Sequence, residues 1–527
     1  MPGSIYRKVG IAAVIMMASI FLSRLFGLFR IMTIAYMGGR SGNVDAYQVA
    51  FVIPEILNHI VASGFLSITF IPIFSHYLAR NQEAQGWQVF SIILTSFGSL
   101  LLIFMIIAHI FAPELVTLLA HGRPDPNFRD SVVRMTRIII PAQFFFFAGG
   151  LFMAVQFAKE SFLIPALAPL IYNLGIVAGG LLLGPRLGMQ GFSWGVFAGA
   201  MAGNFFLQWW GAQRVGMTFS LRFDFGHPDL KRYVKLTLPL MLGLTMFFSM
   251  EIFKIFFGSY LPAGGIADLE YSLRTMLLLV AFFGQAVGVA SYPCMARLVV
   301  EDKLPQLNEL LNKTLRYLSV VIPFSVLLMV LRHEVIFLLF QRGKFDATAT
   351  GHTAAVLIYM LAGSFAFAAN TIVPRAYYAT QDTLFPAIYG TIAVILSIPF
   401  YLLGLKMMGA GGVALAISLS AILQVLVLYA LWNRRTQNRG LPVYLFYLKM
   451  IACGAPLGLF LVWFKSATLS GLDPATLGGS SLRCLITGAV FGIILLTLGY
   501  GLKIKEITGL VDRLRGKFRR SQPPHKP

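Results

Sequence analysis

Long apolar stretches recur along the whole chain and constrain its fold more than any other feature. About fourteen of them run for roughly 18 residues or more, enough for a helix to cross the ~30 Å hydrocarbon core of a bilayer. Their centres lie near residues 24, 62, 103, 145, 173, 200, 246, 282, 320, 364, 395, 422, 454 and 491. Only 12% of the residues are charged, against about 25% in soluble domains. The sequence therefore predicts an all-α polytopic membrane protein.

Basic residues outnumber acidic residues, with 42 Lys and Arg against 21 Asp and Glu. If the spans alternate in direction, one set of connections carries most of this charge: Arg80, Lys159, Arg222, Lys231, Arg232, Lys235, Arg297, Lys303, Arg434, Arg435 and Arg439. The positive-inside rule then places both termini in the cytoplasm. The basic residues are not interleaved with an aromatic platform for stacking bases, so we expect no nucleic-acid partner.

The sequence offers no pattern for a metal, a cofactor or ATP. Its three cysteines, Cys294, Cys453 and Cys484, have neither metal-ligand nor CxxC spacing. No HExxH, Walker A or dinucleotide-binding pattern occurs. A GxSxG pattern from Gly191 to Gly195 opens an apolar helix, where small residues four apart are typical of close helix packing and not of a hydrolase nucleophile. We expect a transporter and not an enzyme.

The chain also repeats itself with an offset of 221 residues. Three pairs of residues in similar surroundings share this offset: Pro72 and Pro293, Pro165 and Pro386, and Gly191 and Gly412. The repeat predicts two six-helix lobes, 1–220 and 221–440, a two-helix extension, 441–505, and a basic cytoplasmic tail, 506–527. Transporters built from parallel repeats bind substrate between the halves and give access to each side in turn.

Three arginines lie within predicted spans. Arg24 and Arg30 belong to the first span, and Arg274 belongs to a span of the second lobe. An arginine at bilayer depth costs at least ~2.5–3.5 kcal/mol, so it faces a bundle interior or a wet cavity, unless it snorkels to an interface or pairs with an acid. Guanidinium groups bind phosphate bidentately and stay charged at physiological pH. The sequence therefore predicts a cavity for a phosphate or pyrophosphate, with snorkelling or pairing as the alternative.

Two acidic residues near the spans have alternative interpretations. Asp45 lies at the start of the second span, where it either contacts the substrate or caps its helix. Glu251 precedes Lys254 by three residues, a spacing that favours a local ion pair. Glu251 also remains a candidate for ion coupling.

Several motifs resemble those of one bacterial family. They are SRLFGLFR (Ser23–Arg30), GNVDAYQVAFVIPEIL (Gly42–Leu57), GFLSITFIPIFSHYL (Gly64–Leu78), FLIPALAPLIYN (Phe162–Asn173), LFQRGKFD (Leu339–Asp346) and YYATQDTLFP (Tyr377–Pro386). Together they resemble the MurJ (MviN) family, flippases for lipid II in cell-wall synthesis. The resemblance implies a fourteen-helix fold of the multidrug/oligosaccharidyl-lipid/polysaccharide exporter type. It also implies a terminal helix pair that makes a groove for a lipid tail.

The resemblance assigns roles to residues of this chain. The cavity arginines of the family fall on Arg24, Arg30 and Arg274, and its acidic residue after the first helix falls on Asp45. The resemblance also implies a sodium site between helices of the second lobe, for which Glu251 and Asp382 are candidates. No cofactor is expected apart from such a coupling cation.

The chain also departs from the family pattern. Asn58 and His59 stand where the family has a basic pair on the second helix, and both stay among the expected substrate-binding residues. Leu273 and Leu277 stand where acidic residues flank the arginine of the eighth helix. These changes predict a less polar cavity than is usual for the family.

The expected function is a flippase that moves lipid II from the cytoplasmic to the outer leaflet of the bacterial inner membrane by alternating access. We expect a monomer whose only partners are the lipid-linked substrate and membrane lipids. Membrane potential can assist at ~2.3 kcal/mol per charge per 100 mV. The alternatives are a flippase for another lipid-linked oligosaccharide, or a drug/cation antiporter of the same fold. An enzyme acting on polyprenyl phosphate is disfavoured because no loop clusters acids for a metal.

Overall fold

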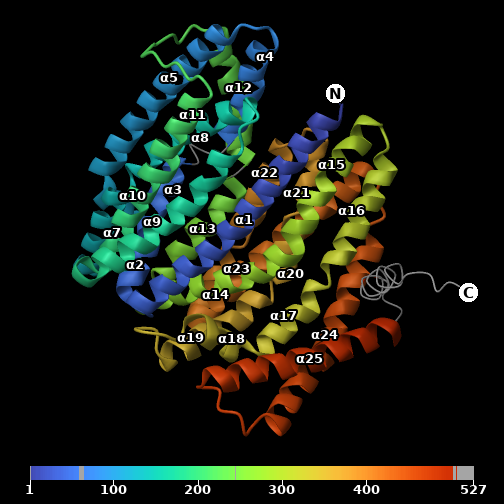
Figure 1. The fold of residues 1–527 in the computed structure, drawn as a ribbon. Coiled ribbons are helices and arrows are strands. Elements are labelled where there is room, and N and C mark those ends of the chain that lie inside the picture. Colours follow the sequence, from blue (N-terminus) through green and yellow to red (C-terminus); the bar gives the residue numbers. More distant parts are fainter. Residues whose placement is uncertain (1, 59–64, 244, 502–505, 507–527) are drawn as a thin grey trace, which may run out of the picture. The chain divides into compact units, whose positions relative to one another are not determined.

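The computed structural model describes residues 2–58, 65–243, 245–501 and 506. Within these ranges the chain forms helices and connecting segments without a strand (Figure 1). The packing divides it into two compact units, Met1–Ala267 with Arg342–Asp346, and Asp268–Gln341 with Ala347–Pro527. This packing boundary does not test the predicted repeat boundary near residue 220, because lobes related by a repeat can exchange neighbouring helices in their packing.

The helices of the first unit follow one another in this order: α1 (Pro2–Gly38), α2 (Gly42–Ala50), α3 (Val52–Leu57), α4 (Phe65–Ala79), α5 (Glu83–Ile110), α6 (Ala112–Leu119), α7 (Pro126–Ile139), α8 (Ala142–Ala158), α9 (Leu163–Leu187), α10 (Gln190–Gly199), the π-helix η2 (Ala200–Phe206), α11 (Leu207–Arg214), α12 (Pro228–Gly243) and α13 (Thr245–Gly258). Helix α1 packs along α9, and the Ser19 hydroxyl donates a hydrogen bond of 2.5 Å to the carbonyl of Ala166.

Helix α14 (Gly265–Val280) begins in the first unit and continues into the second. The remaining helices of the second unit are the π-helix η3 (Ala281–Gln285), α15 (Ala286–Val300), α16 (Leu304–Leu318), α17 (Val321–Val330), α18 (Arg332–Phe340), α19 (Ala347–Leu361), α20 (Ser364–Asn370), α21 (Val373–Ala379), α22 (Leu384–Leu396), α23 (Ile398–Thr436), α24 (Leu441–Thr468) and α25 (Leu477–Gly501). Helices α24 and α25 occupy the predicted two-helix extension and pack on α17 and α18.

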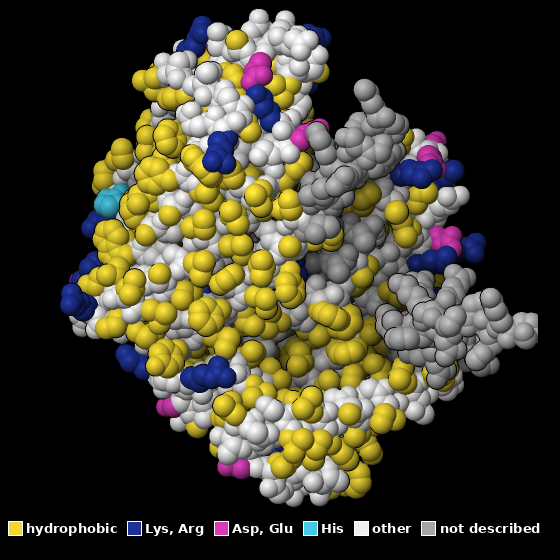
Figure 2. Space-filling model, in the orientation of Figure 1, with side chains coloured by type: hydrophobic (Ala, Val, Ile, Leu, Met, Phe, Trp, Pro, Cys, Tyr) yellow, Lys and Arg dark blue, Asp and Glu magenta, His cyan; other side chains and the backbone are white. Residues whose placement is uncertain are grey.

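Eight helical stretches of the described chain are long and apolar enough to cross a membrane, or nine if α19 and the α20–α21 segment, bent by 55°, form one span. The structure therefore confirms a helical protein with several membrane spans, and the number of about fourteen stays a prediction. One stretch, Leu384–Thr436, has 53 residues and contains a non-helical position at Gly409. At 1.5 Å per residue it is long enough for two crossings. Hydrophobic side chains cover much of the displayed surface (Figure 2).

The backbone supports the repeat seen in the sequence. Four pairs of residues with positive φ are separated by 221 positions: Asn81 and Asp302, Glu160 and Gln381, Gly188 and Gly409, and Gly216 and Gln437. Non-glycine residues seldom adopt this conformation, so four coincidences indicate equivalent turns. Helices α4 and α15 are likewise 221 residues apart at both ends, and each contains an internal proline, Pro72 or Pro293.

Glycines allow α9 and α10 to approach closely. A Cβ atom on Gly195 would lie 2.6 Å from the Gly175 carbonyl oxygen, and one on Gly179 would lie 2.4 Å from the Gly195 Cα. The second unit shows a similar approach, since a Cβ on Gly412 would lie 1.9 Å from the carbonyl oxygen of Gly404. The prediction that the GxSxG pattern serves helix packing is confirmed.

Candidate substrate-binding residues

The first two candidate arginines lie on α1 with different surroundings. The side chain of Arg24 is exposed and that of Arg30 is half-buried. Arg30 lies close enough to the buried Tyr47 and the half-buried Tyr172 to act on them electrostatically. Glu55 acts on Tyr172 in the same way. Arg30 therefore faces a polar region formed by α1, α2, α3 and α9, in which the two tyrosines were not predicted from the sequence.

Asp45 lies at the centre of a closed cluster. Its carboxylate is fully buried and accepts hydrogen bonds from the Arg123 Nη1 at 2.8 Å, the Gly264 N–H at 2.7 Å and the Ala267 N–H at 2.8 Å. Its own helix α2 is capped by Ser41, whose hydroxyl accepts from the Val44 N–H at 3.4 Å. Asp45 therefore does not cap α2 as the sequence suggested, and instead binds the first turn of α14.

Arg123 completes this cluster and was missed from the sequence. Its Nη2 donates to the Leu261 carbonyl at 2.7 Å, and its guanidinium lies 4.6 Å from the centre of the Phe128 ring. The arginine stands in a loop, so neither periodicity nor helix spacing indicates its partner. Asp45 and Arg123 are 78 positions apart in the sequence.

Arg274 forms a more open pair. Its Nε donates to the Glu270 carboxylate at 2.6 Å, with the arginine side chain 39% exposed and the glutamate side chain 6% exposed. The sequence reasoning noted Leu273 and Leu277 and missed Glu270, although an acid four residues before an arginine on a helix is a recognisable pairing signal. Leu273 is buried and Leu277 is half-buried. Glu270 thus supplies the acidic partner of Arg274 one helical turn away.

The polar residues of the second predicted span are only partly described. Asn58 is half-buried and stands at the C-terminal cap of α3. His59 lies outside the described residues. Any role of the two together remains a prediction.

The two candidates for ion coupling are both paired in the structure. Glu251 forms an ion pair of 2.5 Å with the buried Lys254, which confirms the predicted local pairing on α13. Asp382 forms an ion pair with Arg435 and accepts a hydrogen bond of 3.1 Å from the Phe385 N–H at the start of α22. The described residues contain no group of three or more His, Cys, Asp or Glu arranged to hold a metal ion.

The comparisons with known proteins agree on one family. The family model for the lipid II flippase MurJ matches residues 34–477. A probable lipid II flippase MurJ of Vibrio cholerae is 24% identical over 511 residues, covering 93% of this chain and 96% of the relative. The lipid II flippase MurJ of Burkholderia cenocepacia is 26% identical over 452 residues, covering 84% of this chain and 87% of the relative.

Solved structures show the same fold. A lipid II flippase MurJ in an inward closed conformation superposes with a TM-score of 0.72 at 22% identity, covering 92% of this chain and all of that one. An inward-facing MATE multidrug transporter of the MOP superfamily gives 0.66 at 12% identity, covering 81% of this chain and 98% of that one. These likenesses confirm the predicted all-helical multi-span fold. Because the family model spans well over half of the sequence, the chain belongs to the lipid II flippase MurJ family of membrane transporters.

Proposed function

We propose that this chain moves lipid II from the cytoplasmic to the outer leaflet of the inner membrane by alternating access. Membership of the family supports the substrate. The repeated turns at an offset of 221 residues support two six-helix lobes, 1–220 and 221–440, with fourteen spans in all. Such parallel repeats place the substrate between lobes that move as bodies.

Arg24, Arg30 and Arg274 hold the pyrophosphate of the substrate in this proposal. The observation that carries it is the pairing of Arg274 with Glu270, because a nearly buried carboxylate fixes the plane of a guanidinium that is itself 39% exposed. A positioned planar fork is suited to phosphate oxygens. Arg30, half-buried beside two tyrosines, and the exposed Arg24 add positive charge from α1.

The remaining polar candidates have secondary roles in the proposal. Asn58 and His59 contact the sugar-peptide part of the headgroup, and Asp45 holds the end of the cavity in one conformation. Glu251 and Asp382 are candidates for coupling to a cation such as sodium, because each is an acid whose partner could be exchanged for an ion during transport. Both pairs then break at some stage of the cycle.

The terminal helices and the membrane orientation complete the proposal. The lipid tail of the substrate lies along α24 and α25, whose outward side chains Leu459, Trp463 and Leu485 are 60–74% exposed. The excess of basic connections supports cytoplasmic termini. The protein acts as a monomer, since each chain carries both lobes.

The test is replacement of the native flippase in a host from which it can be depleted. Wild-type protein should restore growth, and Arg24→Ala and Arg274→Ala should fail to do so while inserting at wild-type levels. Arg186→Ala is the matched control, because Arg186 is exposed in the last turn of α9. Restoration by both variants would overturn the assignment of the arginines. The lipid-linked precursor that accumulates on the cytoplasmic face identifies the substrate, and one other than lipid II would favour a different lipid-linked oligosaccharide.

A further inference from the structure

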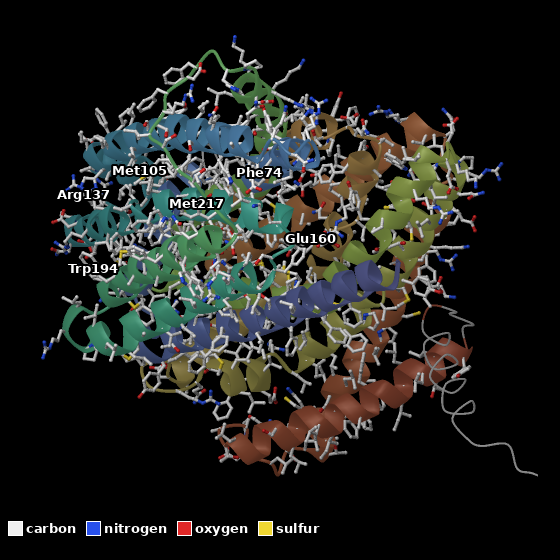
Figure 3. All side chains as sticks on the ribbon, turned by 45° about the horizontal axis from the view of Figure 1, so that its top comes forward. Phe74, Met105, Arg137, Glu160, Trp194 and Met217 are labelled. Carbon is white, nitrogen blue, oxygen red and sulfur yellow. The ribbon has the colours of Figure 1, made fainter. Side chains whose placement is uncertain are left out.

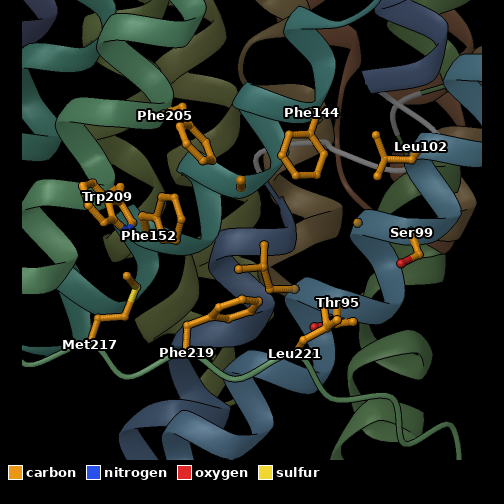
Figure 4. Close-up of a pocket in the computed structure, with 13 residues that line it drawn as sticks. Thr95, Ser99, Leu102, Phe144, Phe152, Phe205, Trp209, Met217, Phe219 and Leu221 are labelled. Carbon is orange, nitrogen blue, oxygen red and sulfur yellow. The ribbon is translucent and has the colours of Figure 1, made fainter.

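A cavity of about 370 Å³ lies within the first unit and includes none of the candidate substrate-binding residues. It is bounded by α5, α8, η2, α11 and the segment 217–221 (Figure 4). Its walls are largely apolar, and five of the thirteen lining residues are aromatic: Phe144, Phe152, Phe205, Trp209 and Phe219. The volume lies in the range of sites that hold small ligands, about 300–1,000 Å³.

The cavity opens on a surface suited to the bilayer. Leu102 on α5 and Trp209 on α11 line it and are each 43% exposed. Helix α5 is one of the stretches long and apolar enough to cross a membrane. The neighbouring Trp210 is also exposed, and exposed tryptophans are enriched at the level of lipid headgroups. A ligand that enters here therefore comes from the lipid phase.

A polar group in the wall lacks a protein partner. Thr95 is among the lining residues, but its side chain is buried, and its hydroxyl oxygen is covered by protein atoms and makes no hydrogen bond within the described part of the chain. One turn earlier on α5, the Ser91 hydroxyl accepts a hydrogen bond of 3.1 Å from the Ser220 N–H, which holds the segment 217–221 against the helix. The hydrogen bond between Ser220 and Ser91 therefore fixes the position of the segment 217–221 that lines the cavity.

The segment that closes the cavity is amphipathic. Its apolar side chains alternate along an irregular stretch: Met217, Phe219, Leu221, Phe223 and Phe225. Of these, Met217 is buried and lines the cavity (Figures 3 and 4), while Leu221 at the mouth is 77% exposed. Exposed aromatic and aliphatic side chains on a connecting segment are suited to insertion between lipids.

Positive charge surrounds the mouth. Arg222 directly follows Leu221, is exposed, and forms no ion pair with any described residue. Arg214, at the end of α11, lies 3.8 Å from the centre of the Trp210 ring. The nearby Asp224 carboxylate accepts a hydrogen bond of 3.1 Å from the Gly226 N–H. Basic residues beside a membrane surface attract anionic headgroups.

We infer that the cavity binds one acyl chain of an anionic glycerophospholipid from the surrounding bilayer, with the phosphate at Arg222. This lipid is a bound component of the membrane and not the transported substrate. It connects α5, α8 and α11 to the segment between the two repeats. The inference does not depend on the proposed transport activity.

Trp209 provides a local probe for the test. The full chain is reconstituted in phosphatidylcholine vesicles containing a small fraction of phosphatidylglycerol with brominated acyl chains, which quench tryptophan fluorescence on contact. The contribution of Trp209 is the difference between wild type and Trp209→Phe. Trp463 on α24 is 60% exposed and, through Trp463→Phe, reports contact with bulk lipid. The Trp209 contribution should be quenched preferentially by brominated phosphatidylglycerol over brominated phosphatidylcholine, and that of Trp463 equally by both.

Two variants separate the acyl-chain site from the headgroup site. Gly98→Leu extends a side chain into the cavity and should weaken binding about tenfold, whereas Gly98→Ala is the control, because its Cβ would make ordinary contacts of 3.5 Å. Arg222→Gln should reduce the preference for the anionic lipid about threefold. Arg186→Gln should change nothing.

Three results would overturn the inference. Equal quenching of the Trp209 and Trp463 contributions by the anionic lipid would show that the cavity has no selective lipid. An unchanged preference in Arg222→Gln, whose exposed side chain is not needed for folding, would remove the headgroup site. Displacement of the brominated lipid by a polyprenyl phosphate would assign the cavity to the tail of the substrate.

Discussion

Asp45 and Arg274 are both charged residues in largely apolar surroundings, but they differ in burial and in their hydrogen-bond partners. The Asp45 carboxylate is fully buried among one arginine and two backbone N–H groups. The Arg274 side chain is 39% exposed, and its Nε donates to the Glu270 carboxylate. An enclosed charge with complete partners stabilises a conformation, whereas a positioned but open charge can bind a ligand. On this basis we propose that Asp45 holds a conformation and that Arg274 contacts the substrate.

The largest effect is expected for Asp45→Ala. The substitution leaves the Arg123 guanidinium and the Gly264 and Ala267 N–H groups without their shared acceptor, at a cost of about 3–5 kcal/mol. Thermal unfolding of the protein in detergent should show a large loss of stability. Asp125→Ala is the control, because the exposed side chain of Asp125 accepts a single hydrogen bond from the described residues, donated by the Asn127 N–H at the start of α7. An Asp45→Ala protein that is as stable as wild type but inactive would instead make Asp45 a substrate ligand.

Arg274→Ala should act mainly on transport. Loss of charge-assisted hydrogen bonds worth about 1.5–3 kcal/mol corresponds to a roughly tenfold to hundredfold loss of activity. The thermal stability should change less than in Asp45→Ala, because the pair is partly open to its surroundings. Arg274→Lys keeps the charge without the planar fork and should retain intermediate activity. The measurement is lipid flipping by the reconstituted protein. A loss of stability equal to that of Asp45→Ala would show that Arg274, like Asp45, mainly stabilises the structure.

Glu334 extends the comparison to the second unit. Its side chain is 1% exposed and accepts hydrogen bonds from Lys465 Nζ at 3.1 Å and Arg483 Nη1 at 3.3 Å. Burial raises the pKa of this carboxyl, but its backbone hydrogen bond, Lys465 and Arg483 outweigh burial and lower the pKa below its usual value. These contacts connect α18 to α24 and α25. Glu334 therefore resembles Asp45 more than Arg274.

The lowered pKa of Glu334 predicts a direction for stability against pH. The contribution of ionised Glu334 to the folding stability is complete above the pKa of about 4.3 that a glutamate has in the unfolded chain. It is lost as the pH falls through the lower pKa of the folded protein. Thermal unfolding between neutral and acidic pH should show this loss in wild type and not in Glu334→Gln, which should be less stable at neutral pH by about 1–3 kcal/mol. Glu309→Gln is the control, since Glu309 and Lys313 form an exposed pair. A pH profile of Glu334→Gln identical to wild type would contradict this assignment.

Local features of the fold were accessible from the sequence. Apolar length predicted a helical protein with several membrane spans, the Gly191–Gly195 pattern predicted close packing, and the spacing of Glu251 and Lys254 predicted their ion pair. These properties depend on residues within a turn or two of each other, or on the bilayer thickness. The 221-residue offset was also readable, because equivalent turns retain similar residues.

The closed cluster of Asp45 was not accessible in the same way. Its partners Arg123 and Gly264 are 78 and 219 positions away, and a loop arginine gives no periodic signal. Glu270 was different, since its spacing from Arg274 could have revealed it. Helix length alone counts Leu384–Thr436 as one stretch, although it contains the non-helical position Gly409 and covers the two spans that the sequence predicts near residues 395 and 422.

The smallest effect on stability is expected for Arg435→Ala, because this substitution removes a partly exposed ion pair. Arg435 is 50% exposed and its partner Asp382 is 23% exposed, and exposed ion pairs contribute about 0–1 kcal/mol. Thermal stability should therefore stay close to that of wild type, with Lys313→Ala as the control for an exposed pair.

Transport by Arg435→Ala measured against sodium concentration gives the second readout. If Asp382 couples to a cation, removal of its competing partner should shift the curve to lower sodium concentration. A curve that superposes on wild type would leave Asp382 with a structural role, as the acceptor of the Phe385 N–H at the start of α22, and Glu251 as the remaining candidate for coupling.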